Sequence, residues 1–365
     1  MGQVPFDLTV SNPTRCGFPY PQDLLASLAD PAGLDYRPEP LGPQQARRTI
    51  ADSYQPWGAE VDPESVVITG STSEAYSLLF KLLCDPGDAV LVPTPSYPLF
   101  DQLSRLDGVD TIPFILDPQD DWRPDLGQIA AAPDRTRAII LVHPNNPTGS
   151  HIHPDDATAI EALCRDRGLA LIIDEVFLPY TLDGGPGSER SFAGSGNCLS
   201  FTLGGLSKMA GLPQLKLAWM VLGGFADEKS SALERLDYIA DAYLSVSTPV
   251  ALAAPRLMES AMIVQTAIAD RCRRNLEFLR QAVTELPPVT VPQVGGGWSV
   301  TIRLPAIIDD EELALQLLTE RGVAVQPGYL FDLPEEGTIV LSLLTPDSIW
   351  REGLAAIFDT VRSRL

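Results

Sequence analysis

The chain has 365 residues, and 45% of them are hydrophobic. This length exceeds the ~250–300 residues at which one core usually stops growing, so two domains are expected. Its 26 basic and 48 acidic side chains give a formal net charge of −22. This charge repels nucleic-acid phosphates and anionic lipid surfaces, so neither nucleic acid nor a membrane is expected as a partner.

The first ten residues carry no targeting signal. MGQVPFDLTV lacks a basic stretch followed by a continuous apolar run, and no window approaches the ~20 apolar residues of a membrane span. The five cysteines form no CxxC pair and are scattered through apolar surroundings. The sequence therefore predicts a cytoplasmic protein with reduced core cysteines.

Short apolar runs alternate with helical patterns between residues 65 and 225. The runs are VVIT at 66–69, AVLVP at 89–93, AIILVH at 138–143, LALIID at 169–174 and LKLAWMVLG at 215–223. Continuous apolar runs favour strands buried on both faces of a mostly parallel sheet. One connecting helix is expected to begin at Ser71, because Ser71 and Glu74 form a capping box, and another follows Pro154. The organisation is therefore βαβ.

The pattern changes after about residue 226. Helix-compatible stretches run to about 286, with Pro249 and Pro255 as starts or kinks. Beyond them we expect a glycine-rich segment that leads into WSVTIRLP, a helix over 309–321, a strand pair near 323–326 and 338–343, and a last helix. This tail predicts a separate α+β domain.

Two of three chemically informative motifs follow predicted strands. HPNNPTG at 143–149 places prolines and a glycine around two asparagines, which predicts a rigid turn where α/β sheets present their ligand crevice. In DEVF at 174–177 an apolar strand ends in a carboxylate, and a buried charge costs free energy unless it has a partner. Taken singly, the first could be an ordinary turn and the second a helix cap or an arginine partner.

The third motif is GGLSK at 204–208, followed by GLPQLK at 211–216. A lysine among small, flexible residues can approach a ligand closely, and desolvation would lower its pKa so that it acts as a Schiff-base amine or a general base. Alone, this lysine would be interpreted as a surface residue. The fixed order of all three motifs is what carries information.

The three motifs together resemble the class I/II aminotransferases, enzymes of fold-type I that depend on pyridoxal 5'-phosphate (PLP). The resemblance covers the chain from about Ser11 to the C-terminus. It implies an α/β fold whose large PLP-binding domain, over 35–250, has a mostly parallel central sheet flanked by helices. A smaller α+β domain would comprise 1–34 with 251–365. The resemblance also implies a homodimer with shared active sites.

Four residues of the motifs match family residues around the PLP ring. Lys208 matches the lysine that forms the internal aldimine and moves a proton between the substrate Cα and C4' of the cofactor. Asp174 matches the carboxylate that keeps the pyridine nitrogen protonated. Asn146 matches the asparagine that hydrogen-bonds the phenolic oxygen, and Tyr97 the ring that stacks on the pyridine, although a core or turn role for Tyr97 stays open.

The expected phosphate contacts come from several segments. A helix that begins near Ser71 offers backbone N–H groups and its dipole to an anion, with the Ser73 hydroxyl and the Thr72 amide foremost. Lys216 stands where most members have an arginine, and Tyr36 resembles the tyrosine that reaches the phosphate from the other subunit. The expected set is Ser71, Thr72, Ser73, Ser207, Lys216 and Tyr36.

Two positions depart from the family pattern. Phe177 replaces a tyrosine whose hydroxyl contacts the phenolic oxygen, which predicts a higher pKa for the internal aldimine. Val340 replaces the arginine that clamps the substrate carboxylate. Arg15 is the first candidate to replace that arginine, because the family's N-terminal segment passes over the pocket, with Arg303 and Arg37 next. A salt bridge elsewhere is the alternative for Arg15.

Two aromatic or histidine motifs remain. Trp298 follows three glycines and is expected to line the substrate pocket, with a role in the small-domain core equally open. His151 and His153 have no third ligand nearby in sequence, so they are interpreted as a surface loop and no metal is predicted.

The predicted function is transfer of an amino group from an amino acid to a 2-oxo acid by a ping-pong mechanism at Lys208, with a neutral or hydrophobic substrate. Because Val340 removes the usual anchor, a PLP-dependent lyase or decarboxylase on the same fold is the alternative. A PLP-binding sensor is disfavoured, since the family's regulators carry an N-terminal DNA-binding domain and only about ten residues precede Ser11.

Overall fold

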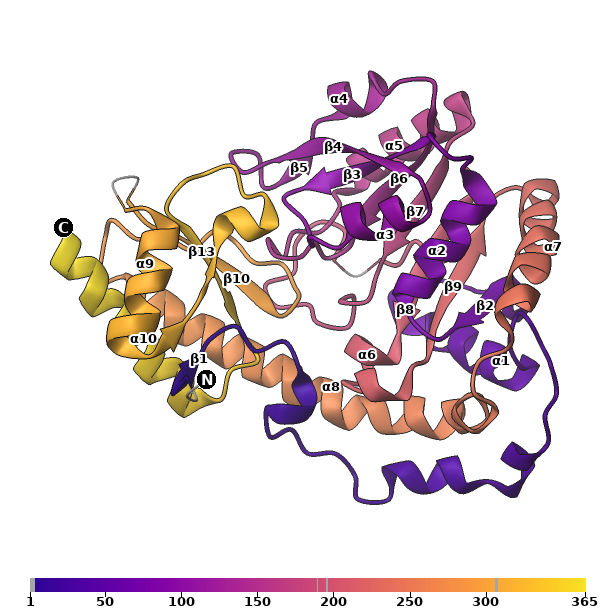
Figure 1. Cartoon of the computed structure of the whole chain (residues 1–365), viewed down its shortest axis with the longest axis horizontal. Helices are drawn as coiled ribbons and strands as arrows, with labels where there is room; N and C mark the ends of the chain where they lie inside the picture. Colours follow the sequence, from indigo (N-terminus) through magenta and orange to yellow (C-terminus); the bar gives the residue numbers. More distant parts are fainter. Residues whose placement is uncertain (1–3, 189, 195, 306–307) are drawn as a thin grey trace.

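The computed structural model describes residues 4–188, 190–194, 196–305 and 308–365 (Figure 1). At its centre lies an eight-stranded sheet with the order β2-β9-β8-β7-β6-β3-β4-β5. Its strands are β2 (Val66–Thr69), β3 (Ala89–Thr94), β4 (Asp110–Asp117), β5 (Arg123–Pro124), β6 (Thr136–Val142), β7 (Ala170–Asp174), β8 (Ser200–Gly205) and β9 (Ala218–Gly223). Neighbours from β8 through β4 are parallel, whereas β9 and β5 pair antiparallel. The predicted mostly parallel sheet is confirmed.

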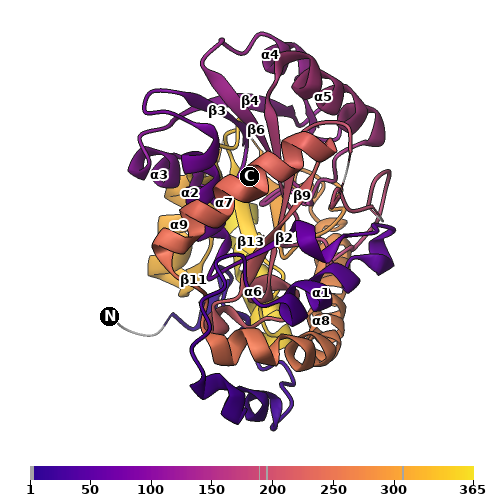
Figure 2. The same ribbon diagram turned by 90° about the vertical axis from the view of Figure 1, so that its right-hand side faces the viewer.

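Helices cover both faces of this sheet. They are α1 (Gln44–Asp52), α2 (Thr72–Leu83), α3 (Phe100–Leu106), α4 (Leu126–Ala130), α5 (Pro154–Arg167) and α7 (Ala226–Tyr243). The core between the sheet and α2, α3 and α7 is separate from the core under α4 and α5. Figure 2 shows α2 and α3 on one side of the strands and α5 on the other. The α/β architecture expected from alternating apolar runs is confirmed.

Helix α2 begins as the sequence predicts. The Ser71 side chain accepts a hydrogen bond from the Glu74 amide at 3.1 Å, and the Glu74 carboxylate accepts one from the Gly70 amide at 2.5 Å. The first bond satisfies an N–H group that the helix terminus leaves without an intrahelical partner, and the second ties the helix to the residue before its cap. The capping box therefore fixes where α2 starts relative to the end of β2.

Strand β8 was not predicted from the sequence. Its residues, SFTLGG, break the apolar run with Ser200, Thr202 and two glycines, yet all six are buried. Gly204 is required here, because a Cβ atom would lie 2.5 Å from the indole nitrogen of Trp219 on β9. Strand β4 was missed as well, since its exposed edge residues interrupt the apolar pattern.

A second, smaller set of strands lies beside the large sheet (Figure 1). β10 (Ser299–Arg303), β13 (Thr338–Ser342) and β12 (Gln326–Pro327) form an antiparallel sheet, and β1 (Phe6–Asp7) pairs with β11 (Val323–Ala324). Helices α9 (Asp310–Gln316), which continues as a π-helical turn over Leu317–Arg321, and α10 (Asp347–Arg364) accompany them. The expected helix at 309–321, strand at 338–343 and last helix are confirmed. The strand expected at 323–326 is instead divided, because β11 pairs with β1 and only β12 pairs with β13. The domain boundaries at 34/35 and 250/251 stay predictions.

The 36-residue helix α8 (Thr248–Val283) joins the two parts of the molecule (Figure 1). Its first half contributes Ala254 and Leu257 to a core shared with α1, β2 and β9. Its second half contributes Ile268 and Leu276 to the core of β10, β13 and α10. Pro249 stands in the first turn and Pro255 lies within the helix, as the sequence suggested.

Two further observations concern the chain as a whole. Over the described ranges, no helix combines the length and the apolar character needed to cross a bilayer. All five cysteines are free, and four of them are buried.

Candidate active site

One cavity of about 300 Å³ brings together most of the predicted site residues at the carboxyl ends of β6, β7 and β8. Those that line it are Ser71, Thr72, Ser73, Tyr97, Asn146, Asp174, Phe177, Ser207, Lys208 and Lys216. Ligand crevices of α/β sheets lie at this edge, because the loops that follow parallel strands converge there. Arg15, Tyr36 and Trp298 are not among the residues that line it.

Lys208 lies just beyond β8, in the short helix α6 (Leu206–Met209). Its backbone carbonyl accepts a hydrogen bond from the Tyr180 hydroxyl at 2.6 Å, which holds the turn in place. Its Nζ lies 5.6 Å from the ring centre of Phe177 and 5.2 Å from that of Trp298. Burial lowers the pKa of Lys208, while the charge of Asp174 acts in the opposite direction. A lysine with a lowered pKa is more readily available as the neutral, nucleophilic amine.

Asp174 is the last residue of β7 and lines the same cavity. Burial raises its pKa to about 6, against the opposing effects of the Val176 amide, the Tyr76 hydroxyl and Lys208. The Val176 amide donates to Oδ1 at 3.1 Å, and the Tyr76 hydroxyl donates to Oδ2 at 3.2 Å. A carboxylate can accept about four hydrogen bonds, so Asp174 can receive a further donor from a ligand.

Tyr76 is a cavity residue that the sequence did not single out. It is buried on α2, with its ring centre 5.4 Å from that of Phe100 in an edge-on arrangement. A tyrosine within a predicted apolar helix face is ordinarily core. One signal could have found it, because Tyr76 follows Ser73 by three residues and so lies on the same helix face as the expected phosphate contact.

Glu175 follows Asp174 directly in the chain, but it does not line the cavity. It is buried away from the cavity, where the Ser191 hydroxyl and the Phe192 amide donate to its two carboxylate oxygens at 2.6 and 2.7 Å. Burial raises the pKa of Glu175 to about 8. The carboxylate of Glu175 therefore ties down residues 191–192, while that of Asp174 faces a ligand space.

The turn at 143–149 is rigid for reasons visible in its contacts. Asn145 Nδ2 donates to the carbonyl of Pro95 at 3.1 Å and to Thr148 Oγ1 at 2.9 Å. Gly149 has φ +72°, and a Cβ there would lie 2.6 Å from the carbonyl oxygen of Gly296. The turn is thus packed closely against the glycine-rich segment before β10, and Asn146 lines the cavity from it.

The start of α2 offers an anion site on the cavity wall. Ser71 is occupied as the helix cap, whereas the Thr72 and Ser73 amides have no acceptor in the described part of the chain. Lys216, in the left-handed conformation with φ 55°, and Ser207 line the same cavity. Unpartnered amides at a helix N-terminus beside a lysine suit a phosphate. With an amine of lowered pKa and a carboxylate nearby, these residues fit PLP.

The arginines considered for the substrate carboxylate lie elsewhere. Arg303 Nε contacts Glu335 at 2.7 Å and its guanidinium lies over the Trp122 ring at 5.6 Å. Arg37 pairs with Asp35 at 2.7 Å, and both are exposed. No arginine lines the described cavity.

Arg15 and Val340 differ in their exposure to solvent. Arg15 is exposed in a short 3-10 helix (Pro13–Arg15) and has no ion-pair partner in the described ranges. Val340 is 1% exposed on β13 and pairs in register with Thr301. Whether Arg15 replaces the missing anchor stays a prediction.

Trp298 is a core residue beside the site rather than part of its lining. It is 4% exposed and packs edge-on against Phe177 and Tyr180, at 5.3 and 5.1 Å between ring centres. Its ring centre lies 5.2 Å from Nζ of Lys208. Tyr36 is 65% exposed, which is compatible with a contact to another chain.

The histidine pair has local structural contacts. The His151 ring packs edge-on against His143 at 5.1 Å, and burial lowers its pKa to about 4. His153 accepts a hydrogen bond from the Asp155 amide at 3.3 Å, at the start of α5. Within the described residues, no three His, Cys, Asp or Glu side chains are grouped to hold a metal ion.

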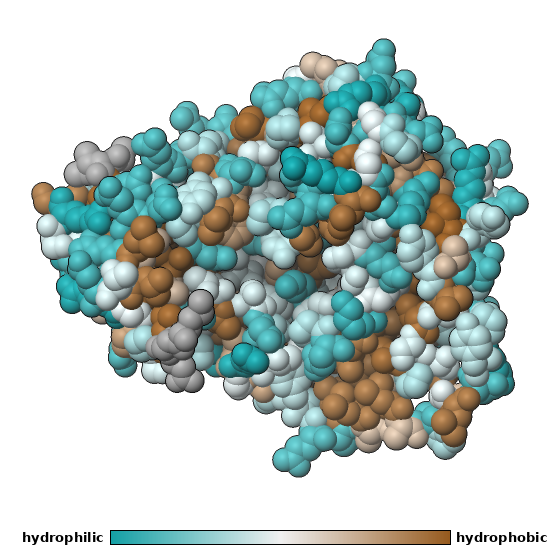
Figure 3. Space-filling view, in the orientation of Figure 1, coloured by the Kyte–Doolittle hydropathy of each residue, from teal (hydrophilic) through white to brown (hydrophobic). Residues whose placement is uncertain are grey.

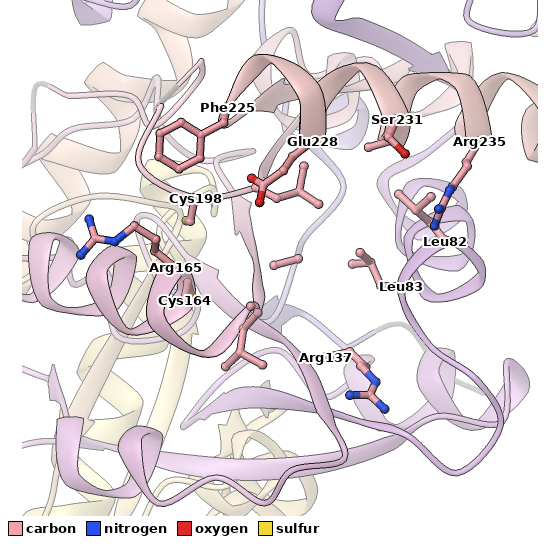
Figure 4. Close-up of a pocket in the computed structure, with 15 residues that line it drawn as sticks. Leu82, Leu83, Arg137, Cys164, Arg165, Cys198, Phe225, Glu228, Ser231 and Arg235 are labelled. Carbon is pink, nitrogen blue, oxygen red and sulfur yellow. The ribbon is translucent and has the colours of Figure 1, made fainter.

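A second hollow, also about 300 Å³, lies at the opposite end of the sheet (Figure 4). Its labelled residues include Cys164, Cys198, Phe225 and Arg235, and it shares no residue with the Lys208 cavity. Arg137, at its rim, pairs with Asp88 at 2.9 Å. Nothing in this hollow resembles the chemistry gathered around Lys208.

Known proteins share the sequence pattern. The profile of the family Aminotransferase class I and II matches residues 31–351. Alanine aminotransferase of Mycobacterium tuberculosis (strain ATCC 25618 / H37Rv) is 27% identical over 96% of this chain and 83% of that protein. Glutamate-pyruvate aminotransferase AlaA of Escherichia coli (strain K12) is 27% identical over 91% and 84%. Capreomycidine synthase of Streptomyces vinaceus is 32% identical over 87% and 79%.

Solved structures share the fold. Alanine aminotransferase from Pyrococcus furiosus superposes with a TM-score of 0.88 at 24% identity, covering 98% of this chain and 92% of that one. An aminotransferase from Escherichia coli gives a TM-score of 0.83 at 25% identity, with 98% and 90% covered. The two-part architecture is therefore that of known aminotransferase structures.

Proposed function

The chain belongs to the class I and II aminotransferases, and we propose that it moves an amino group from a neutral or apolar amino acid to a 2-oxo acid at the Lys208 cavity. The observation that carries this proposal is the meeting of Lys208, Asp174 and Asn146 in one cavity from three separate strand ends. PLP, the cofactor of the family, supplies an electron-withdrawing ring for the charge that develops on the substrate carbon.

Lys208 acts on the substrate proton in this proposal. Its lowered pKa favours the neutral amine, which would attach the resting cofactor and, once the substrate amine has displaced it, would take the proton from the substrate Cα. The rings of Phe177 and Trp298, which pack against each other, lie near the amine and would help to exclude water from it. The same amine would return a proton when the second substrate is converted. The cycle would be ping-pong because the cofactor would hold the amino group between the two half-reactions.

Asp174 and Asn146 would hold the two polar edges of the cofactor ring. The ionised Asp174 would accept the N–H of the pyridine, and its hydrogen bonds from Val176 and Tyr76 keep the carboxylate oriented. Asn146 would donate to the phenolic oxygen. Tyr97 lines the cavity and is about half exposed, which supports a stacking role on the ring face.

The phosphate of the cofactor would lie at the start of α2. The Thr72 and Ser73 amides, with the Ser73 and Ser207 hydroxyls, donate hydrogen bonds, and Lys216 adds a positive charge. The Ser71 hydroxyl keeps its capping role.

The substrate side of the cavity supports a neutral or apolar side chain. Leu99, Phe100, Leu103 and Val176 line it, and no arginine does in the described residues. Arg15 is our candidate for the carboxylate. The segment that carries it is tethered near Lys208, because the Tyr20 hydroxyl donates to the carbonyl of Gly211 at 2.7 Å.

We also propose a cytoplasmic homodimer. Exposed apolar residues from adjacent elements, Leu25, Leu34, Met262 and Ile263, gather where the N-terminal 3-10 helices pack on α8. Figure 3 shows hydrophobic residues gathered low on this face, in the region of α8. Monomers rarely expose such patches, so a second copy of the chain is the expected cover. The five free cysteines support a reducing compartment.

A PLP-dependent lyase or decarboxylase stays the second candidate. Val340 in place of an arginine favours it, as does a relative at 32% identity that is named a synthase rather than an aminotransferase. The two candidates differ in whether the cofactor leaves the first half-reaction carrying the amino group.

An absorbance spectrum distinguishes the candidates. Purified protein saturated with PLP is mixed with each L-amino acid in turn, without a 2-oxo acid. Amino transfer predicts that the visible band converts to the near-ultraviolet band of pyridoxamine phosphate with neutral amino acids. Product release while the visible band persists would support the lyase instead. Absence of any cofactor band would contradict both.

A further inference from the structure

One hydrogen bond joins the small sheet to the Asn146 turn. Ser299, the first residue of β10, donates from Oγ to Oδ1 of Asn146 at 3.1 Å. The two residues are 153 positions apart in sequence, and Asn146 lines the Lys208 cavity. The sequence contains no local sign of this contact.

The backbones on both sides of this hydrogen bond are held in place. The amide of Gly296 donates to the carbonyl of Gly149 at 2.9 Å, and the amide of Gly297 donates to that of Tyr180 at 2.9 Å. A Cβ on Gly296 would lie 2.8 Å from the Tyr180 carbonyl oxygen, so the segment is tightly enclosed. The position of Ser299 relative to Asn146 therefore follows from rigid backbone rather than from a mobile side chain.

We propose that Ser299 is a positioning residue that fixes the orientation of the Asn146 side-chain amide. The oxygen and nitrogen of a side-chain amide lie in one plane and point to opposite sides of the Cβ–Cγ bond, so a donor at Oδ1 leaves the NH₂ group for a ligand. The Asn146 Nδ2 atom has no acceptor among the described residues. This inference rests on the proposed function, in which the NH₂ group meets the phenolic oxygen of PLP.

Other side chains on the same face of the small sheet do not take this role. Along β10, Val300 and Ile302 enter the core, so Ser299, Thr301 and Arg303 face the other way. Thr301 Oγ1 is buried without a partner, and Arg303 pairs with Glu335.

The opposing strand β13 gives the same result. The Val340 side chain has no hydrogen-bond donor, and Ser342 Oγ donates to the carbonyl of Val10 at 2.5 Å. In the described part of this face, Ser299 alone contacts Asn146.

Phe177 has no hydroxyl to donate to the phenolic oxygen of PLP, so the orientation of the Asn146 amide has a larger effect on the charge of that oxygen. A donor held at the phenolic oxygen stabilises its negative charge, which weakens proton binding by the neighbouring nitrogen. This lowers the pH at which the visible band of the bound cofactor changes. An Asn146 amide free to rotate would stabilise that charge less, so the transition would move to higher pH.

The test is a spectroscopic pH titration of the PLP-loaded protein without substrate. For Ser299→Ala, the apparent pKa at which the visible absorbance of the bound cofactor changes is expected to rise by about half a unit to one unit. A shift of this size corresponds to a lost hydrogen bond. Ser299→Thr, which keeps a hydroxyl, should return the pKa toward the wild-type value. Thr301→Val is the matched control, because it removes a hydroxyl from the same face of β10 that does not contact Asn146, and it should leave the pKa unchanged.

A double-mutant cycle with Asn146→Ala tests the proposed route. Once the amide is gone, Ser299→Ala should produce no further shift. An unchanged pKa in Ser299→Ala, or an equal shift with and without Asn146, would overturn the inference while leaving amino transfer intact. A wild-type protein with no titrating cofactor band would instead contradict the proposed function.

Discussion

The residues expected to hold the cofactor and those expected to hold the substrate are placed differently. At the cofactor end, Asp174, Asn146 and the start of α2 each follow a strand of the large sheet and have fixed hydrogen-bond partners. On the substrate side, neither position lines the cavity, because Val340 is buried on β13 and Arg15 lies exposed on the N-terminal segment. The residues proposed to hold the cofactor are thus fixed by their neighbours, whereas the one proposed to hold the substrate is not.

The largest expected effect comes from Lys208→Ala. Losing both the cofactor attachment and the base at the substrate Cα should lower kcat for amino transfer by at least about 10³-fold. Rates of 2-oxo acid formation measure this. Lys229→Ala, at a partly buried position on α7 outside the cavity, is the control and should behave as wild type. Activity near wild type in Lys208→Ala would refute the central assignment.

Asp174→Asn should have the next largest effect. An amide cannot hold the pyridine proton by charge, so kcat should fall by about 10²-fold or more. In the wild type, Asp174 must be ionised, and its pKa is about 6. A pyridine N–H donated to Asp174 lowers this pKa, so activity should fall only below about pH 6, and this acid limb should be absent from the residual activity of the variant.

The same substitution should raise the stability of the cofactor-free protein. Burial raises the pKa of Asp174 above its unfolded value, so the ionised form is less stable in the folded state. This penalty is present above pH 6 and fades as pH falls toward the unfolded pKa. Thermal unfolding at pH 8 should give a higher Tm for Asp174→Asn than for wild type, with the difference shrinking near pH 5. A lower Tm at pH 8 would contradict this account.

Arg15→Ala probes the substrate end. If Arg15 binds the carboxylate, its loss removes a charge-assisted hydrogen bond, and KM for the amino acid should rise by about tenfold or more while kcat changes less. Arg48→Ala, an exposed arginine on α1, is the control. An unchanged KM in Arg15→Ala would show that another group, or no charged group, holds the substrate.

Tyr76→Phe should give the smallest effect, and it tests whether the Tyr76 hydroxyl tunes the pKa of Asp174. The Tyr76 hydroxyl opposes the burial that raises the pKa of Asp174. Without it, the acid limb of the kcat profile should move to higher pH by about half a unit, with only a few-fold change at pH 8. A profile identical to wild type would mean that the hydrogen bond does not act on Asp174.

Local patterns predicted much of the fold and the cofactor residues. The Ser71 and Glu74 capping box was readable because both partners lie within one helical turn. Strand β8 was not, because Gly204 is set by the Trp219 indole on a neighbouring strand. Tyr76 and Ser299 were missed for the same reason, since each meets its partner, Asp174 or Asn146, only after the chain has folded.

The attachment of the cofactor to Lys208 can be tested directly by borohydride reduction of the PLP-loaded protein, followed by peptide mass spectrometry. The chain has four lysines, Lys81, Lys208, Lys216 and Lys229, so every possible attachment point is resolved. The account predicts that the mass of the reduced cofactor is found on the peptide of Lys208 alone. Attachment at Lys216, the other lysine of the cavity, or recovery of unmodified Lys208 from a fully loaded protein, would contradict it.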